Sequence, residues 1–194
     1  LPSVAFMSLR STTANTTLVA EMDDGSFVRG ETKITASHRH IVELTLDPPS
    51  PAPLPETLEA IERADLITVG PGSLYTSLIT NLLVEGIPAA LANARGRRVY
   101  VCNLMTQANE SLGLSAADHI EKIYEHTRAP IFDCALVNTA PFSPETLARY
   151  QAEGASPIVV DVDRIESLGV RYIASNFACE GNVVRHYADR VTKV

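Results

Sequence analysis

Apolar and polar positions largely alternate along the first 47 residues, which are rich in Ser, Thr and β-branched side chains. The clearest runs are residues 17–22 and 40–46, where a period of two residues predicts strands. Asp23, Asp24 and Gly25 follow the first run and supply the positive φ that a tight hairpin turn requires. The pattern therefore predicts a small antiparallel sheet or meander at the N-terminal end.

Five prolines occur in the eight residues from Pro48 to Pro55. Proline has no backbone N–H and a fixed φ, so this segment cannot form a helix or a central strand. We expect an extended connector at residues 48–55 that separates the β-rich region 1–47 from the remainder, residues 56–194.

Helical and strand-like patterns alternate after the connector. Helices are predicted at residues 56–64, within 73–93, and at 115–125, 143–151 and 164–168. Buried strands are predicted at residues 65–69, 98–102, 132–137 and 158–160, with final strands near Tyr172 and Val183. Ser115 and Asp118 resemble a capping box at the start of one helix. This order is typical of an α/β fold with a doubly wound, mostly parallel sheet, and we expect one compact domain.

Composition narrows the class of protein. The chain has 194 residues and a formal net charge of −7, and no segment concentrates Lys and Arg as a nucleic-acid groove would need. No apolar run approaches the about 18 residues of a membrane span. The three cysteines lie far apart in apolar surroundings, which favours reduced core thiols over disulfides. We expect a cytoplasmic protein without nucleic-acid or membrane partners.

The loop at residues 70–77 is the first candidate for ligand binding. It follows a predicted buried strand with the sequence Gly-Pro-Gly-Ser and continues into a helical pattern. Glycines allow close backbone approach, and a helix start presents free N–H groups to an anion such as phosphate. The alternative is a common Gly-Pro-Gly turn with Ser73 as a helix cap. The loop matches neither the dinucleotide fingerprint nor the P-loop, whose lysine it lacks.

The loop at residues 103–110 is the second candidate. It follows the strand at residues 98–102 and is rich in amides and hydroxyls, including Asn103, Thr106 and Gln107. Such groups are costly next to a buried strand unless they are paired, either with a ligand or with the loop's own backbone. Both loops follow parallel strands, so we expect them to meet at the same edge of the sheet.

Other polar residues are weaker candidates. His38 and His40 would share one face of a strand, but no third metal ligand is apparent. Capping explains Asp118 and His119 better than acid–base chemistry does. Asp161 and Asp163 could hold Mg²⁺, and Tyr150 and Arg185 could contact a ligand. Each of these four residues also has an ordinary structural explanation. No Gly-x-Ser-x-Gly elbow and no Cys–His pair suggests a covalent nucleophile.

The two loops also resemble a known family. Three segments carry the resemblance: DLITVGPGSLYTS at 65–77, NLLVEGI at 81–87 and VYVCNLMTQ at 99–107. It extends backward through Glu21 to Gly25 and forward to Arg185, so it covers nearly the whole chain. The sequence is similar to the gluconeogenesis factor family, which is related to 2-phospho-L-lactate transferase. The transferase branch typically has Ser-Asn-Pro where this chain has Ser73-Leu74-Tyr75.

The resemblance implies a Rossmann-like core at residues 56–194 that binds a UDP-sugar, notably UDP-N-acetylglucosamine. It also implies a regulatory role in gluconeogenic growth, cell shape and cell-wall precursor supply. The positions that match the family's nucleotide-sugar-binding residues are Gly70, Gly72, Ser73, Tyr75, Thr76, Asn103, Thr106, Gln107, Tyr150 and Arg185. Tyr150 would stack on the base and Arg185 would pair with a phosphate.

Two departures from the family pattern matter. The family opens with a Gly-rich loop that forms the other half of the nucleotide site, and this chain begins at Leu1 without one. We therefore expect the natural protein to extend upstream. Asn109 stands where the family usually has Gly, and Asn tolerates the left-handed conformation. The alternative function is a phospholactyl-type transferase with Mg²⁺ on a nucleotide diphosphate donor, and a homodimer is a reasonable expectation for either function.

Overall fold

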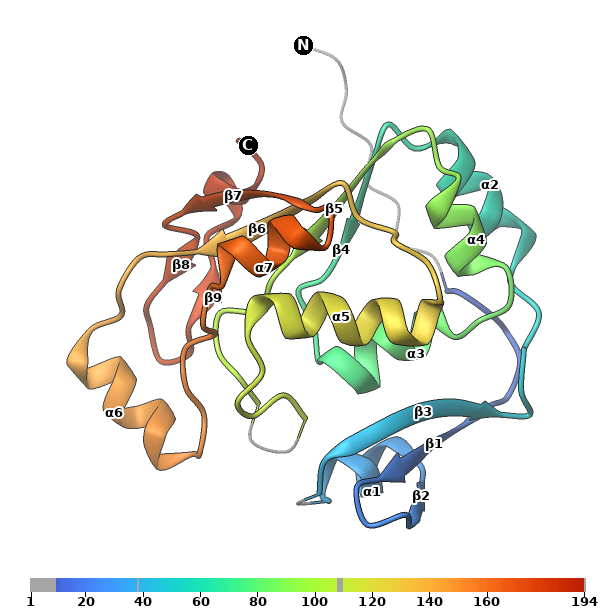
Figure 1. Ribbon diagram of the computed structural model, residues 1–194, viewed down its shortest axis with the longest axis horizontal. Helices are drawn as coiled ribbons and strands as arrows, with labels where there is room; N and C mark the ends of the chain where they lie inside the picture. The colour runs from blue at the N-terminus through green and yellow to red at the C-terminus, as the bar shows by residue number, and fades with distance from the viewer. Residues whose placement is uncertain (1–9, 38, 108–109, 194) are drawn as a thin grey trace.

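The computed structural model describes residues 10–37, 39–107 and 110–193 (Figure 1). Its N-terminal part is an antiparallel sheet of order β2-β1-β3, formed by β1 (Thr17–Met22), β2 (Phe27–Arg29) and β3 (Ile41–Asp47). Helix α1 (Glu31–Thr35) follows β2. Gly25 has φ 77° in the turn between β1 and β2, so the predicted hairpin is confirmed. His38 and Asn109 lie outside the described residues.

The second sheet is parallel, with the order β4-β5-β6-β7. Its strands are β4 (Leu66–Val69), β5 (Arg97–Val101), β6 (Cys134–Asn138) and β7 (Arg171–Ser175). The helices between them are η1 (Leu74–Ile79), α3 (Thr80–Leu82), α4 (Ile87–Ala92), α5 (Ala116–Thr127), α6 (Pro144–Ala152) and α7 (Val162–Ser167), after α2 (Pro55–Arg63). The hairpin β8 (Ala178–Cys179) and β9 (Arg185–His186) and helix α8 (Ala188–Val191) end the described chain. The mixed α/β fold class is confirmed.

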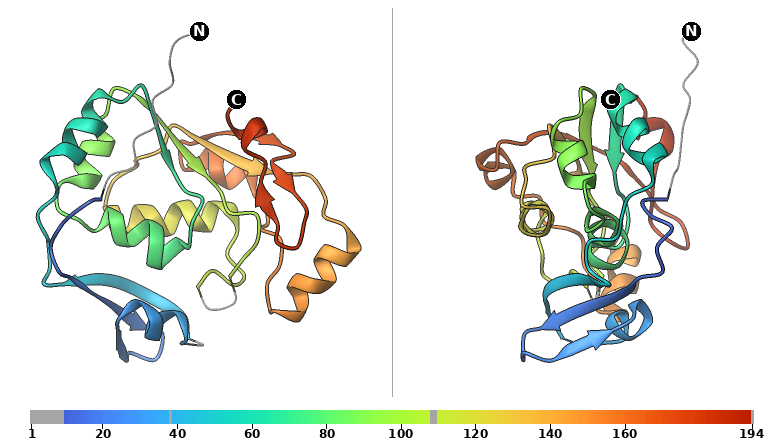
Figure 2. Two further views of the ribbon diagram at one scale, coloured as in Figure 1. Left: turned by 180° about the vertical axis from the view of Figure 1, so that it is seen from behind. Right: turned by 90° about the vertical axis from the view of Figure 1, so that its right-hand side faces the viewer.

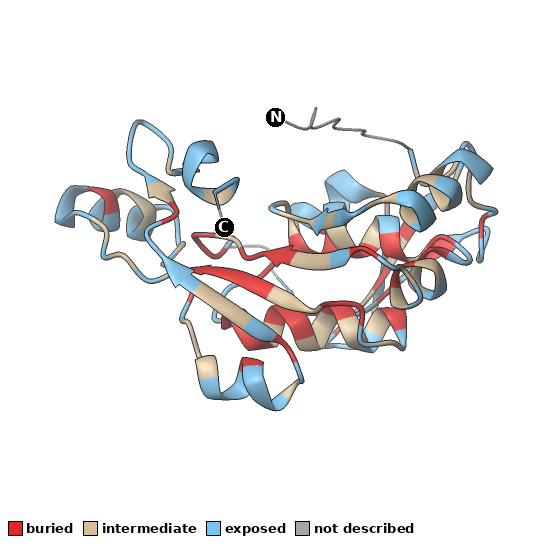
Figure 3. Ribbon diagram, turned by 90° about the horizontal axis from the view of Figure 1, so that it is seen from above, coloured by how far each residue is buried: buried red, intermediate tan, exposed pale blue. Residues whose placement is uncertain are grey.

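The helices that connect the strands gather on one face of the parallel sheet, whereas α8 packs against the opposite face through Val191. Its strands follow one another in chain order, and right-handed crossovers then place every connection on the same side. One large core joins Tyr100 and Ala135 of this face to Ile120 of α5 and to Leu44 of the antiparallel sheet. Helices α3 and α5 therefore lie between the two sheets (Figures 1 and 2). Figure 3 shows buried residues concentrated where the parallel sheet meets these helices.

The opposite face of the parallel sheet carries only a small cluster, in which Val101 and Leu136 pack against Phe177. Strand β4 lies at the edge of this sheet, and its Leu66 is 60% exposed. The prediction of a buried strand at residues 65–69 is therefore wrong in burial, although the strand itself exists. Periodicity along one strand does not reveal its position in the sheet.

One further strand prediction is wrong. Residues 158–160 form no strand, and pairing in this region is limited to one bridge between Met105 and Pro157. Ile158 and Val160 instead point their apolar side chains into a cavity described below. The strand expected near Val183 is present as β9, two residues further along, while Val183 itself lies in a bend and is 56% exposed.

The thiols are free, but they are not all core groups. Cys102 is buried, Cys134 is partly buried and Cys179 is exposed on β8. The prediction of core thiols is wrong for Cys179, because β8 belongs to a peripheral two-stranded hairpin. Within the described residues, no helix combines the length and the apolar character needed to cross a bilayer.

His126 joins α5 to the antiparallel sheet. Its Nε2 accepts the backbone N–H of Leu44 on β3 at 3.1 Å, and its Nδ1 lies 2.7 Å from the carbonyl oxygen of Lys122. The first bond requires a lone pair on Nε2, so the proton must lie on Nδ1 and the ring is neutral. Burial lowers the pKa of His126. The hydrogen bond between α5 and the antiparallel sheet therefore depends on a neutral imidazole.

This geometry gives a pH prediction. An unfolded histidine titrates near pH 6.5, whereas burial lowers the pKa of His126, His119 and His186 in the folded chain. The unfolded chain therefore binds more protons just below pH 6.5, and the free energy of unfolding falls as the pH falls. Urea unfolding should give a lower stability at pH 5.5 than at pH 7.5. His126→Gln should flatten this dependence, and equal stability of the unmodified protein at both pH values would refute it.

Candidate ligand-binding site

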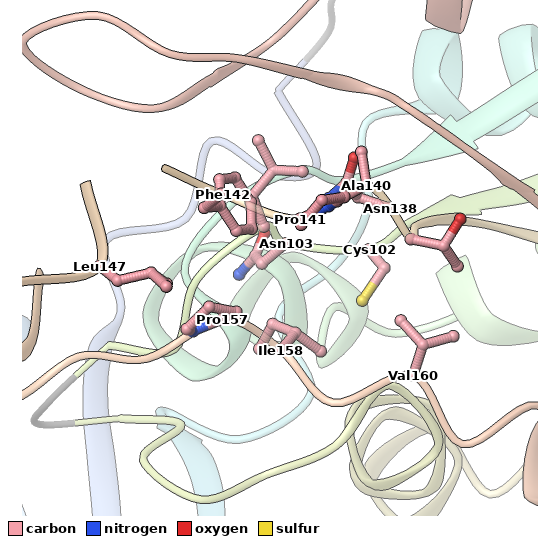
Figure 4. Close-up of a pocket in the computed structure, with 12 residues that line it drawn as sticks. Cys102, Asn103, Asn138, Ala140, Pro141, Phe142, Leu147, Pro157, Ile158 and Val160 are labelled. Atoms are coloured by element: carbon pink, nitrogen blue, oxygen red, sulfur yellow. The ribbon is translucent and has the colours of Figure 1, made fainter. Parts of the chain in front are cut away.

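A cavity of about 410 Å³ opens at the carboxyl ends of β5 and β6 (Figure 4). Ligands of open α/β sheets collect at this edge, and the volume lies in the usual range for small-molecule sites. Three chain segments and α6 form the wall. The lining residues are Cys102, Asn103, Leu104, Asn138, Thr139, Ala140, Pro141, Phe142, Leu147, Pro157, Ile158 and Val160.

The wall of the cavity is mainly apolar. Figure 4 shows Phe142, Leu147, Pro157 and Ile158 around the space. The amide of Asn138 is held on both sides, because its Nδ2 donates to the Ala140 carbonyl at 3.0 Å and its Oδ1 accepts the Phe177 N–H at 2.9 Å. The cavity is therefore suited to the flat or apolar part of a ligand rather than to a charged group.

Cys102 lies at the end of β5 and lines the cavity. Burial raises the pKa of its thiol to about 12. The group is therefore a protonated thiol at neutral pH and not a thiolate nucleophile.

Asn103 connects the cavity to the first candidate loop. The Gly72 N–H donates to Asn103 Oδ1 at 3.1 Å, and Asn103 Nδ2 donates to the Gly72 carbonyl at 2.8 Å. Gly70 has φ 88°, and a Cβ built on it would lie 2.6 Å from the Val101 carbonyl oxygen. Glycine is therefore required at position 70 by the close approach of two protein segments. The expected meeting of the two loops at one edge of the sheet is confirmed.

Glu110 occupies the helix start that the sequence suggested for phosphate. Its Oε2 accepts the N–H groups of Tyr75 at 3.2 Å and Thr76 at 3.4 Å, and its Oε1 accepts the Thr76 hydroxyl at 2.6 Å. Glu110 as a whole residue is only 9% exposed. A carboxylate at a helix N-terminus offsets the positive end of the dipole. An external anion would have to compete with Glu110 for the same donors.

The other predicted loop residues also contact protein. Gln107 is exposed, and its Nε2 donates to Ser73 Oγ at 3.0 Å. The Thr106 hydroxyl accepts the Ser156 N–H at 2.9 Å. Tyr75 is buried, and its hydroxyl donates to the Ile41 carbonyl at 3.3 Å. Burial raises the pKa of Tyr75 to about 12.

Tyr150 and Arg185 lie on two neighbouring peripheral elements, α6 and β9. The Tyr150 hydroxyl accepts the Val184 N–H at 2.9 Å. Arg185 is exposed, while the next residue, His186, places Nε2 3.0 Å from the Cys102 carbonyl oxygen. Successive side chains of a strand point to opposite faces, so Arg185 points away from the end of β5.

Three of the weaker candidates, Asp118, Asp161 and His119, have structural roles. Asp118 completes the predicted capping box with Ser115, through bonds of 2.8 and 3.2 Å. Asp161 accepts the Ser115 hydroxyl at 2.7 Å and the Ala117 N–H at 2.9 Å, and Arg164 pairs with it at 3.0 Å. His119 is fully buried in α5. In the described parts of the chain, no three His, Cys, Asp or Glu side chains are arranged to hold a metal ion.

Comparison with known proteins decides the family. The sequence pattern of the family described as 2-phospho-L-lactate transferase CofD matches residues 7–178. The chain belongs to this CofD family. The resemblance to gluconeogenesis factors is confirmed by curated relatives of that name. The relative from Halalkalibacterium halodurans is 43% identical over 91% of this chain and 55% of its own length. The one from Bacillus subtilis is 37% identical over 96% of this chain and 59% of its own.

A solved structure supports the fold of this CofD-family chain. A crystal structure of a UPF0052 family member from Bacillus halodurans aligns with a TM-score of 0.91 and 42% identity. The alignment covers 94% of this chain and 59% of that chain. This CofD-family chain thus spans little more than half the length of the relatives that it matches.

Apart from residues 102–104, the residues that line the cavity are not marked by any motif of this CofD-family chain, and neither is Glu110. Glu110 appeared only as the end of a polar loop, and its partners lie 34 and 35 positions away. Phe142, Leu147 and Ile158 are ordinary apolar residues of three separate segments. One of these segments has a weak signal in the sequence, because residues 157–160 are apolar and follow a predicted helix. The same pattern also predicts a strand, so it does not distinguish a strand from a cavity wall.

Proposed function

We propose that this chain binds a UDP-sugar, with UDP-N-acetylglucosamine as the first candidate, at the cavity beyond β5 and β6. The observation that carries the proposal is the position of the cavity, which lies directly beside Asn103 and the loop that Asn103 holds. We propose that binding serves a regulatory role in gluconeogenic growth, cell shape and cell-wall precursor supply. The names of the gluconeogenesis factor relatives support the metabolic part of this role.

The chemistry of the wall suggests an orientation for the ligand. The apolar cavity would receive the uracil ring, which offers two flat faces for contact with Phe142 and the prolines. The diphosphate would lie at the polar rim near Ser73 and Gln107, outside the donors already bonded to Glu110. Tyr75 and Thr76 would then support the site by holding Glu110 rather than by touching the ligand.

A side chain that fills the cavity tests this proposal. Leu147 lines the cavity and is 38% exposed, so Leu147→Trp can block the space from α6 without entering the core. We expect at least tenfold weaker binding of UDP-N-acetylglucosamine, about 1.4 kcal/mol, by calorimetry. Val159→Trp is the matched control, because Val159 lies between two lining residues but is 68% exposed. Equal affinity of both variants, or no binding by the folded unmodified protein at millimolar ligand, contradicts the proposal.

A transferase is the alternative, and the description of the matched family supports it. A phospholactyl-type transferase would use a nucleotide diphosphate donor with Mg²⁺. Of the two candidate carboxylates, Asp161 is already bonded to Ser115, Ala117 and Arg164, and the described residues contain no group of three His, Cys, Asp or Glu side chains that could hold a metal ion. Consumption of the donor in the presence of Mg²⁺ and a hydroxyl acceptor would favour this alternative, and unchanged nucleotide would count against it.

A further inference from the structure

Helix α6 forms one wall of the cavity but has little contact with the core. Thr146 is its one buried residue, whereas Leu147 reaches the cavity. Figure 1 shows α6 projecting from the body of the molecule near the β8–β9 hairpin. Its position must therefore be set by contacts other than core packing.

The β8–β9 hairpin supplies these contacts at both ends of α6. At the C-terminal end, the Tyr150 hydroxyl accepts the Val184 N–H at 2.9 Å, and Arg149 Nη2 donates to the Gly181 carbonyl at 2.8 Å. At the N-terminal end, Glu180 accepts the Ser143 hydroxyl at 2.6 Å and the Ser143 N–H at 3.1 Å. The hydrogen bonds from Ser143 lower the pKa of Glu180. Helix α6 is thus hydrogen-bonded to the hairpin near both of its ends.

The hairpin also contacts a residue that lines the cavity. His186 on β9 bonds through Nε2 to the carbonyl oxygen of Cys102, a lining residue. A carbonyl accepts, so Nε2 carries the proton. The hairpin therefore links the floor of the cavity, at Cys102, to the wall that carries Leu147.

We propose that Tyr150 and Glu180 are positioning residues that lock α6 and the β8–β9 hairpin into one unit, and that this unit sets the width of the cavity and hence its affinity. The affinity part rests on the proposed function. The hydroxyl of Tyr150 supports this role through its bond with Val184, and stacking of the Tyr150 ring on a base stays a separate prediction. It assigns a role to Glu180, which no sequence motif suggested.

The locked unit predicts a coupling that can be measured without ligand. Tyr150→Phe removes only the hydroxyl and should speed hydrogen exchange at Ser143 N–H, which Glu180 holds at the other end of α6. Glu180→Gln should likewise speed exchange at Val184 N–H, which Tyr150 holds. If each variant loosens only its own bond, helix and hairpin are not one unit and the inference is overturned.

Ligand affinity is the second readout. At a temperature where all variants are folded, Tyr150→Phe and Glu180→Gln should each weaken UDP binding about fivefold, the effect of one hydrogen bond. The double variant should lose less affinity for UDP than the product of the two single losses, because both substitutions disrupt the same unit. Tyr124→Phe is the matched control, since its hydroxyl accepts the Phe132 N–H at 3.3 Å far from this hairpin along the chain, and it should not change affinity.

The outcomes separate the two proposals. Coupled exchange with weaker UDP binding supports the inference. Coupled exchange with unchanged UDP affinity in both variants overturns the positioning role while the proposed function stands. Coupled exchange without UDP binding by the unmodified protein refutes the proposed function, and with it the role of the unit in affinity.

Discussion

Gly70→Ala is expected to destabilise the protein by about 2–5 kcal/mol, one of the two largest effects of a single substitution in this account. Gly70 has φ 88°, which strains any residue with a Cβ, and the new Cβ would lie 2.6 Å from the Val101 carbonyl oxygen. The new Cβ would clash with backbone rather than with a flexible side chain, so the clash is relieved only if the end of β4 moves away from β5. Urea unfolding measures the loss, and ligand affinity should fall with the displaced loop.

Gly113→Ala is the matched control for Gly70→Ala. Gly113 also has a positive φ, 77°, but a Cβ there would meet no atom within 4 Å. This substitution should cost only the backbone strain, about 1–2 kcal/mol. Equal losses for the two variants would show that the close approach of Gly70 to Val101 does not constrain the loop.

Glu110→Ala is the second substitution with a large expected effect. It leaves the N–H groups of Tyr75 and Thr76 and the Thr76 hydroxyl without their acceptor in a buried site. Unsatisfied buried donors cost about 1–3 kcal/mol each, so we expect a total loss of about 3–5 kcal/mol after local relaxation. Chemical denaturation gives the total, and hydrogen exchange at Tyr75 and Thr76 should accelerate.

Two further variants test the role of Glu110. Glu110→Gln keeps one acceptor oxygen and should lose clearly less stability than Glu110→Ala. Glu85→Ala removes a carboxylate from an exposed position and should stay within about 0.5 kcal/mol of the unmodified protein. A Glu110→Ala variant as stable as Glu85→Ala would mean that the carboxylate does not hold the start of η1.

Local signals predicted the local parts of the fold. The hairpin turn at Gly25 and the capping box of Ser115 and Asp118 depend on residues at most three positions apart, and both appear as expected. The exposure of Leu66 could not be predicted, because it depends on β4 lying at the edge of the sheet. The apolar run at 158–160 was ambiguous for a related reason: a short apolar segment can pair in a sheet or line a cavity.

The candidate site likewise has a part that the sequence predicts and a part that it does not. The topology of a parallel sheet was enough to bring the two loops together, and the paired bonds between Gly72 and Asn103 show that they meet. The sequence could not show that Glu110 fills the donors of the first loop, because polar side chains compete for partners across distant segments. The proposed ligand contacts at Tyr150 and Arg185 stay predictions, and the position of the Tyr150 hydroxyl against Val184 gives the former a different proposed task.

The central claim is that a UDP-sugar binds where the cavity meets the loops at Asn103 and Gly72. A titration of the ¹⁵N-labelled protein with UDP-N-acetylglucosamine, followed by amide chemical shifts, tests it most directly. The account predicts saturable shifts at Leu104, Thr139, Leu147 and Ile158, which line the cavity, and none at Val19 in the distant antiparallel sheet. No shifts at millimolar ligand, or shifts confined to the antiparallel sheet, would contradict it.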